Sequence, residues 1–230
     1  MNEATQSPSD QGLSTISRII GVITSPRPTF DDIVQRPTWL VPFVLVVALG
    51  VLNSYLLIDL IAKAQVEQMS QNPNVTEQQI EMTTNITKSY GWMFAIVTTP
   101  LFYVIVGAVL LFTGNVILGG ESRFKVLFSV TCWSGVISII TSAITVPIML
   151  SRGAIESPTS LAFLAPSDDK TSFLYSLLSS LDLLTIWYVA VMGIGVAAAY
   201  KFTNQKGITV TATWWIILIV VGAGWRAMFS

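Results

Sequence analysis

The stretch Leu181–Tyr200 reads LDLLTIWYVAVMGIGVAAAY and carries one charge, Asp182, at its second position. The 18 residues after Asp182 are uncharged, close to the roughly 20 that an α-helix needs to cross about 30 Å of hydrocarbon. Gly193 and Gly195 each precede an alanine by four residues, a spacing that lets a second helix approach closely. The stretch therefore predicts a membrane-spanning helix with an acidic start and a packing surface of small residues.

Composition extends this interpretation to the whole chain. The 230 residues are 52% hydrophobic and 11% charged, against roughly 25% charged residues in an average soluble domain. Five uncharged windows of at least 18 residues occur: Pro37–Ile58, Ser89–Gly120, Val126–Ser151, Leu183–Tyr200 and Gly207–Trp225. Backbone polar groups in lipid must be satisfied within each segment. We therefore expect an all-α, polytopic transmembrane helical bundle with five membrane spans, at about 39–60, 90–118, 124–150, 182–202 and 208–228.

The sequence offers few groups for catalysis or metal binding. It has no histidine and one cysteine, Cys132, inside a predicted span, which removes histidine bases, histidine ligands, CxxC sites and internal disulfides. Gly193-x-Gly195-x-x-Ala198 fits a dinucleotide-binding pattern, but no strand precedes it. The net charge of −1 gives no case for nucleic acid. We predict no enzymatic activity, no cofactor, no metal site and no nucleic-acid partner.

The amino-terminal region divides into a polar tail and two short helices. Residues 1–12 are rich in Ser, Gln, Asn and Asp, which predicts a disordered tail before a single domain over 13–230. Apolar residues then recur at helical spacing at Leu13, Ile16, Ile19, Ile20 and Ile23. They predict a short amphipathic helix that lies in the membrane interface or packs on the end of the bundle. Thr29 to Asp32 reads as the capping sequence of a second short helix.

Two carboxylates and one polar stripe are the candidate functional groups within the spans. Asp59 and Asp182 lie at the ends of predicted spans, where an ionisable group is a functional candidate. Each also has a structural interpretation, which we favour. Ser179-x-x-Asp182 is a helix-capping sequence, and Asp59 could pair with Lys63, four residues on.

Hydroxyls recur along the third predicted span at Thr131, Ser134, Ser138, Thr141 and Thr145. These positions are three or four residues apart, so they share one helical face, and we expect that face to look into the bundle. Trp187 is expected to be a packing or interface residue. Gly119 and Gly120 predict a tight turn that returns the chain as an antiparallel hairpin.

Charge asymmetry predicts the orientation in the membrane. The amino-terminal side of the predicted spans carries Arg18, Arg27, Arg36, Arg123, Lys125, Lys201 and Lys206, and the other side carries Lys63, Lys88, Arg152, Lys170 and Arg226. The two shortest loops lie on the first side and both are basic. By the positive-inside rule we expect a cytoplasmic amino terminus and an external carboxyl terminus in a cell (inner or plasma) membrane. Acidic residues gather on the external side: Asp59, Glu67, Glu77, Glu81, Glu156, Asp168, Asp169 and Asp182.

Several short motifs resemble one family. They are Ser25-Pro26-Arg27-Pro28-Thr29-Phe30, Leu118-Gly119-Gly120, Trp133-Ser134 and Leu181-Asp182-x-x-x-Ile186-Trp187. With five spans and an amphipathic lead-in, they resemble the Yip family of small multi-pass membrane proteins from Ser17 onward. For eukaryotic members the resemblance implies vesicle traffic and binding of Rab-type GTPases. Only Thr98-Thr99-Pro100 stands in place of their Asp-Leu-Tyr-Gly-Pro motif, so GTPase binding is not supported, and the chain is more similar to the prokaryotic branch.

We interpret the chain as a non-enzymatic integral membrane protein that acts by association with lipids, with other membrane proteins or with itself, in membrane organisation or a trafficking-like role. The alternative is a small transporter or channel subunit that uses the polar face of the third span and the outer carboxylates. Transport requires polar groups deep in several spans. Only Asn53, Asn115 and hydroxyls are available there.

Overall fold

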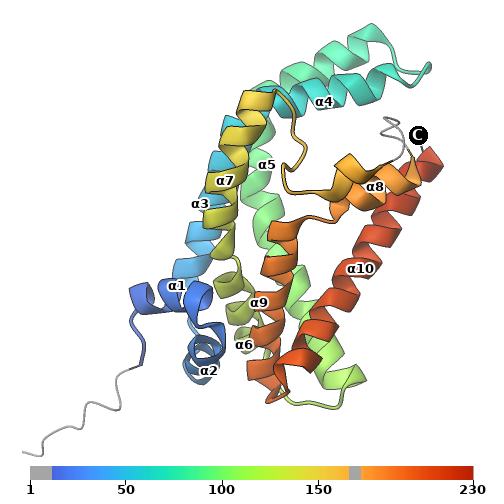
Figure 1. Cartoon of the computed structure of the whole chain (residues 1–230). Helices are drawn as coiled ribbons and strands as arrows, with labels where there is room; N and C mark the ends of the chain where they lie inside the picture. Colours follow the sequence, from blue (N-terminus) through green and yellow to red (C-terminus); the bar gives the residue numbers. More distant parts are fainter. Residues whose placement is uncertain (1–11, 166–171, 230) are drawn as a thin grey trace, which may run out of the picture.

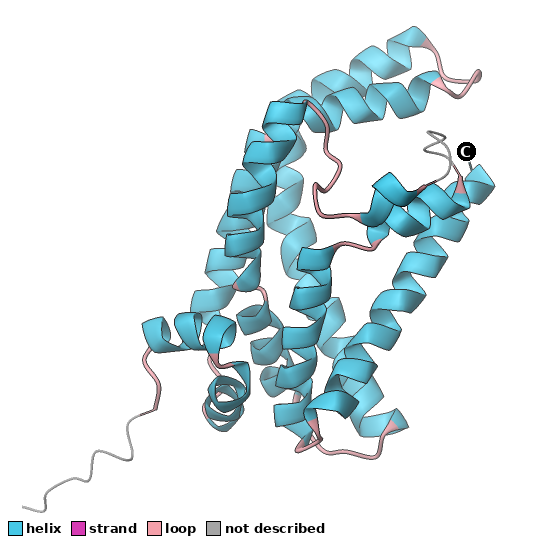
Figure 2. Cartoon of the chain, in the orientation of Figure 1, coloured by secondary structure: helices cyan, strands magenta, loops and turns pink. Residues whose placement is uncertain are grey.

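The computed structural model describes residues 12–165 and 172–229, with side chains to residue 225. Within these ranges the chain is helical, with one isolated bridge between Ser160 and Asp182 (Figure 2). The all-α prediction is confirmed. The predicted disordered tail lies outside the described residues except for Gly12. The carboxylates Asp168 and Asp169 also lie outside them.

The long helices run beside one another, and the last helix finishes at the opposite end of the bundle from the two short amino-terminal helices (Figure 1). In chain order the elements are α1 Thr15–Thr24, α2 Pro26–Gln35, α3 Leu40–Leu56, α4 Ile58–Ser70, α5 Glu77–Phe112, η2 Thr113–Ile117, α6 Phe124–Ser134, α7 Ile137–Arg152, η3 Leu161–Leu164, α8 Phe173–Ser180, α9 Leu183–Tyr200 and α10 Asn204–Phe229.

Four helical segments are long and apolar enough to cross a membrane: 77–117, 124–152, 183–200 and 204–225. A fifth is reached only if α2 and α3 count as one span, although these helices are bent by 119°. The predicted first span at 39–60 is instead the 17-residue helix α3, which Leu57 separates from α4. At 1.5 Å per residue α3 is about 26 Å long, shorter than the hydrocarbon layer. The chain is a multi-pass membrane protein with four to five candidate spans.

The second short helix begins earlier than the sequence predicts. Ser25 separates α1 from α2, and Pro26 opens α2. Proline suits the first helical position, because its missing N–H would have no partner there. Thr29 is therefore inside α2, where its hydroxyl donates to the Ser25 carbonyl at 2.8 Å. The prediction that Thr29 begins this helix is wrong.

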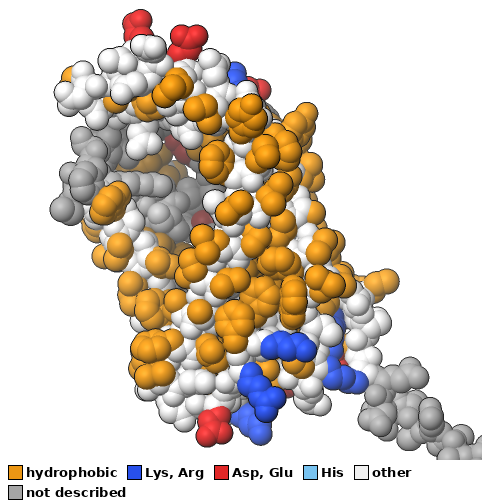
Figure 3. All heavy atoms as spheres, turned by 180° about the vertical axis from the view of Figure 1, so that it is seen from behind, with side chains coloured by type: hydrophobic (Ala, Val, Ile, Leu, Met, Phe, Trp, Pro, Cys, Tyr) orange, Lys and Arg blue, Asp and Glu red, His pale blue; other side chains and the backbone are white. Residues whose placement is uncertain are grey.

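The surface between the two ends of the bundle is apolar (Figure 3). Phe94 on α5 is 60% exposed and Leu218 on α10 is 61% exposed, as expected of side chains that contact lipid tails. Most of the lysines and arginines in view gather at one end of this apolar band and most of the acidic residues at the other, although each end also shows the opposite charge (Figure 3). We call these the basic end, with Arg27, Arg36, Arg123, Lys125, Lys201 and Lys206, and the acidic end, with Asp59, Glu67, Glu77 and Glu81.

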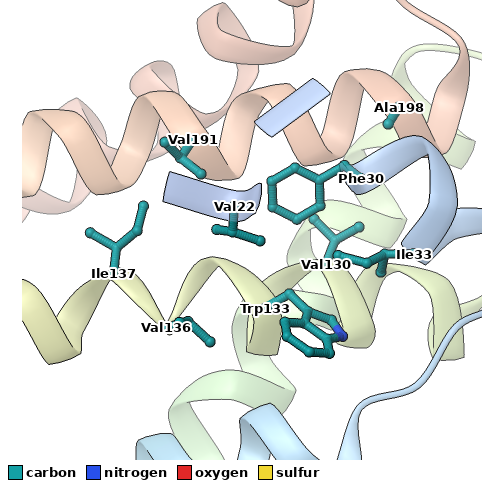
Figure 4. Close-up of a cluster of buried hydrophobic side chains, with 9 residues drawn as sticks. All are labelled: Val22, Phe30, Ile33, Val130, Trp133, Val136, Ile137, Val191 and Ala198. Atoms are coloured by element: carbon teal, nitrogen blue, oxygen red, sulfur yellow. The ribbon is translucent and has the colours of Figure 1, made fainter. Parts of the chain in front are cut away.

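Helix α9 is the centre of the fold. In its span 56% of the residues are buried, against 22–28% in the other three segments. The largest buried cluster joins α9 to α1, α2, α6 and α7 around Phe30 and Trp133 (Figure 4). A second cluster joins α9 to α5 and α6 around Leu110 and Tyr200. Helices α1 and α2 thus close the basic end of the bundle against α9.

The small residues of α9 face two different neighbours. A Cβ on Gly193 would lie 2.5 Å from the Cα of Ile208 in α10, so the two backbones touch. A Cβ on Gly195 would lie 2.5 Å from Val130 in α6 and 3.0 Å from Phe30 in α2. The predicted helix contact is present, but it is divided between α10 on one side and α2 with α6 on the other.

Gly193→Ala should lower the free energy of unfolding by about 1–3 kcal/mol, the usual range for overpacking, because the new methyl would meet the α10 backbone. Gly222→Ala is the matched control, since a Cβ there meets no atom within 4 Å. That substitution should be neutral or stabilise α10 by up to about 1 kcal/mol. Thermal unfolding in detergent measures both. Equal losses in the two variants would contradict the close contact of α9 with α10.

Candidate functional site

A cavity of about 450 Å³ lies among α5, α7, α8 and the start of α9. Of its fourteen lining residues, nine carry a hydroxyl and one, Asp182, carries a carboxylate. No lysine or arginine is among them. We call this space the Asp182 cavity. It unites two features that are at least 37 residues apart in the sequence, the hydroxyl stripe of the third span and the carboxylate before the fourth.

Asp182 is the N-cap of α9 and is buried, with 7% of its surface exposed. Its Oδ1 accepts the Thr185 backbone N–H at 2.8 Å and the Thr185 hydroxyl at 3.1 Å. Its Oδ2 accepts hydroxyls from Ser157, in a short hydrogen bond, and from Thr159 at 2.5 Å. The carboxylate therefore fastens the loop after α7 to the start of α9.

The cap differs in detail from the predicted one. Ser179 does not cap α9, because it belongs to α8 and donates its hydroxyl to the Ser176 carbonyl. Helix α8 ends at Ser180, and Leu181 adopts an extended conformation before the cap. Asp182 itself then supplies the side-chain oxygen, a role in which aspartate is among the preferred residues.

Asp182 precedes the span 183–200 and keeps its charge. Burial raises its pKa, but hydrogen bonds from Ser157, Thr159 and Thr185 lower it by more, so the pKa lies below its ordinary value of 3.8. The carboxylate is thus ionised at neutral pH. No ion pair to Asp182 is formed within the described ranges, so neutral hydroxyls and one backbone amide stabilise this charge.

The predicted hydroxyl stripe faces the interior in two ways. Thr131 and Ser134 are fully buried and donate to the carbonyls of Leu127 and Val130, one turn back in α6. Ser138, Thr141 and Thr145 of α7 instead line the Asp182 cavity. The change occurs at Gly135 and Val136, which separate α6 from α7.

Sequence reasoning missed Tyr188, Ser157 and Thr159. Tyr188 lines the cavity, and its hydroxyl oxygen is buried with no hydrogen-bond partner among the described residues. Asp182, Thr185 and Tyr188 are three residues apart and share one face of α9, a spacing that could have revealed the tyrosine. The loop residues Ser157 and Thr159 showed only a turn pattern, which does not indicate what they contact.

Asp59, the other candidate carboxylate, is not part of this cavity. Its side chain is 80% exposed and lies 3.0 Å from the Lys88 ammonium of α5. The predicted partner Lys63 contacts Glu67 instead. Lys63 and Asp59 share α4, but Lys88 reaches Asp59 because α4 and α5 form an antiparallel pair (Figure 1). An ion pair this exposed contributes little to stability.

The remaining candidates have structural surroundings. Trp187 packs against the largest buried cluster. Gly119 has φ +65°, a left-handed conformation that suits the predicted tight turn. A Cβ on Gly120 would meet the Tyr200 ring at 2.6 Å. Among the described residues, no three His, Cys, Asp or Glu side chains gather to hold a metal ion.

Known proteins similar to this chain are membrane proteins. A family model described as Yip1 domain matches residues 20–225. The membrane protein YknW of Bacillus subtilis (strain 168) is 24% identical over 205 residues, which make up 88% of this chain and 84% of that protein. No solved structure gives a significant match. The family match runs from α1 to α10 and includes every element that lines the Asp182 cavity.

Asp182→Asn should cost less than about 1 kcal/mol of stability, since an amide oxygen can still cap Thr185 and the Ser157 and Thr159 hydroxyls can rotate to accept its N–H groups. Asp182→Leu removes the cap and leaves the partly buried hydroxyls of Ser157, Thr159 and Thr185 without their acceptor, so we expect a loss of more than about 2 kcal/mol. Thermal unfolding of the two purified variants gives the comparison. Equal destabilisation would mean that the charge itself holds the loop.

Proposed function

The chain belongs to the Yip1 domain family, and from that membership we propose that it is a non-enzymatic integral membrane protein that acts by association with lipids. The proposed contact is at the basic end, where α1 forms a fixed amphipathic platform. Membrane organisation or a trafficking-like role would follow from such a contact. The observation that carries the proposal is that α1 is locked to the bundle by one face and exposes apolar side chains on another.

The locked face of α1 centres on Arg18, which is 5% exposed. Its guanidinium lies 2.6 Å from Asp32 of α2 and donates to the Thr38 hydroxyl at 2.6 Å and the Arg36 carbonyl at 3.3 Å. The guanidinium also lies 5.8 Å from the ring centroid of Trp133, within the range of a cation–π interaction. We call this arrangement the Arg18 clasp. It joins α1, α2 and α6 in one rigid unit.

Asp32 is held in the charged form by this clasp. Burial raises its pKa, but hydrogen bonds from Arg18, the Leu13 backbone and Arg36, together with the Arg18 charge, lower it by more. The net pKa lies below its ordinary value of 3.8. Asp32 is therefore ionised at neutral pH, and its contribution to stability is lost only as the pH falls below about 4.

Two isoleucines of α1, Ile16 and Ile20, are 70% and 55% exposed beside smaller hydroxyl side chains, and Leu13, just before the helix, is 43% exposed. Val22 is buried against the bundle, which is the packing role predicted for α1. The interfacial role stays a prediction, and the exposed isoleucines support it. An interfacial helix buries such side chains among lipid headgroups and acyl chains.

Charge at the same end favours anionic lipid. Arg123, Lys125, Lys201 and Lys206 are exposed around the turns that join the spans. A surface lysine or arginine near an anionic leaflet contributes about 1 kcal/mol to binding. Arg27 connects the platform to these turns, because it donates to the Phe202 carbonyl at 3.1 Å and to Asn204 at 2.8 Å.

A transporter or channel subunit is the second candidate, because the third-span hydroxyls and Asp182 line one cavity. Two observations favour binding over conduction. Residues next to the cavity toward the basic end, Trp133 and Val136, are 1% exposed, so packed side chains close that route. Asn53 and Asn115, the amides within the spans, are hydrogen-bonded to Ser142 and Ser122 and offer no open relay.

We further propose a cytoplasmic basic end in the inner or plasma membrane, following the positive-inside rule. Reporter fusions placed after Gln205 and after Ser230 should then report opposite sides, with the Gln205 fusion in the cytoplasm. A fusion after Gln71, in the turn between α4 and α5, should report the external side. Gln205 and Ser230 on one side would exclude α10 as a span and with it the proposed orientation.

A lipid-contact measurement tests the platform. In a Cys132→Ala background, single cysteines at Ile16 and Ile20 carry a fluorescent label, and brominated acyl chains are the quencher. Both labels should be quenched in anionic bilayers. A label at Gln35, an exposed polar position at the end of α2, is the control and should be quenched several-fold less. Equal quenching at all three positions would contradict an interfacial α1.

A further inference from the structure

We propose that the Asp182 cavity is a binding site for an organic ammonium group. This inference concerns the acidic half of the bundle and does not depend on lipid contacts of α1. It rests on the size of the cavity, on the sign of its charge and on the hydrogen-bonding groups of its wall.

The size favours a small organic molecule over a bare ion. A volume of about 450 Å³ falls in the range of roughly 300–1,000 Å³ that small-molecule sites occupy. A dehydrated calcium ion would need six to eight oxygen ligands at about 2.3–2.6 Å, usually from several carboxylates. The cavity supplies one carboxylate, and both of its oxygens are engaged by the protein.

The charge selects a cation. Asp182 contributes one negative charge, and no basic side chain of the described residues lines the cavity. A carboxylate stabilised by neutral donors keeps its field, whereas one paired with arginine, like Asp32 in the Arg18 clasp, does not. An anion such as phosphate would be repelled by the negative charge of Asp182, and no described basic side chain in the cavity wall would offset that repulsion. A positively charged group placed in the cavity would supply the missing counter-charge.

The wall suits an ammonium that also forms hydrogen bonds. Hydroxyl oxygens of Ser138, Thr141 and Ser180 line the cavity, and a hydroxyl that already donates to a carbonyl still accepts from an N–H. Tyr188 carries a buried hydroxyl that has no hydrogen-bond partner within residues 12–165 and 172–225. Phe102 and Tyr103 bring aromatic rings to the same wall, where a cation can lie against a ring face.

Two sources offer this chemistry, a soluble amine and the headgroup of an aminolipid. In the second case the ammonium would enter the cavity and the phosphate would stay outside, because the part of the chain that the structure describes brings no basic residue to the site. Both sources share the electrostatic attraction to Asp182 and the hydrogen bonds with the hydroxyls. They differ in whether the molecule is supplied from water or is retained with the membrane.

The soluble arm uses ethanolamine as the probe and 1-propanol, which carries a methyl in place of the ammonium, as its neutral counterpart. Isothermal titration of the purified full-length protein should give saturable ethanolamine binding and at least about tenfold weaker binding of 1-propanol, because charge supplies the difference. Asp182→Asn, which retains the cap, should weaken ethanolamine binding by at least about tenfold. Asp59→Asn is the matched control and should change nothing, since Asp59 lies outside the cavity.

The lipid arm uses native mass spectrometry of protein released from nanodiscs that contain phosphatidylethanolamine and phosphatidylglycerol in equal amounts. Retention of phosphatidylethanolamine that falls several-fold in Asp182→Asn, but not in Asp59→Asn, identifies the lipid headgroup as the source. Asp182-dependent binding in either arm supports the proposal. Its absence from both arms overturns it, as does equal binding of 1-propanol or of calcium chloride with the same dependence on Asp182.

A second variant separates ligand contact from structure. Tyr188→Phe removes a buried hydroxyl that has no partner, so thermal stability without ligand should be unchanged or slightly raised. If that hydroxyl pairs with the bound ammonium compound, affinity for the species that binds should fall several-fold in the same variant. Unchanged affinity would remove Tyr188 from the site, and lower stability without ligand would show that its hydroxyl is already paired.

Discussion

The close approach of α9 to its neighbours is the constraint on which the remaining structure depends. Gly193 lets the α10 backbone touch α9, and Gly195 makes room for Phe30 and Val130 on another side. In lipid the hydrophobic effect does not drive helices together, because the acyl chains are as apolar as the side chains. Close packing with many van der Waals contacts must stabilise their association instead. A helix surrounded in this way fixes the places of α2, α6, α7 and α10, and through them both ends of the bundle.

Each end then stabilises one buried charge, by different means. Arg18 has an opposite charge within 2.6 Å and an aromatic ring beside it, so its charge is paired and the clasp behaves as structure. Asp182 has neutral donors alone among the described residues. Hydrogen bonds offset the loss of hydration but leave the charge in place. That difference, rather than burial itself, distinguishes a structural joint from a cavity that attracts a cation.

Sequence patterns predicted what periodicity and length can encode. Uncharged windows located the helices, and hydroxyls three or four residues apart predicted an inward face. Small residues in Leu181–Tyr200 predicted close packing. Contacts between separate elements carry no such pattern: Ser157 reaches Asp182 across 25 residues, and Lys88 displaces Lys63 as the partner of Asp59. The start of α2 at Pro26 and the length of α3 were also not predicted, because helix boundaries depend on local caps and on tertiary contacts.

The break between α6 and α7 determines what the hydroxyl stripe can do. Gly135 and Val136 interrupt the helix, and a Cβ on Gly135 would meet the Val46 side chain at 2.8 Å, so α3 lies against this point. Before the break, the Thr131 and Ser134 hydroxyls lie in a packed core and donate hydrogen bonds to carbonyls of their own helix. Beyond it, Ser138, Thr141 and Thr145 reach the cavity. Conduction would require the packed core around Thr131 and Ser134 to open, whereas ligand binding requires only the Asp182 cavity, which is already present.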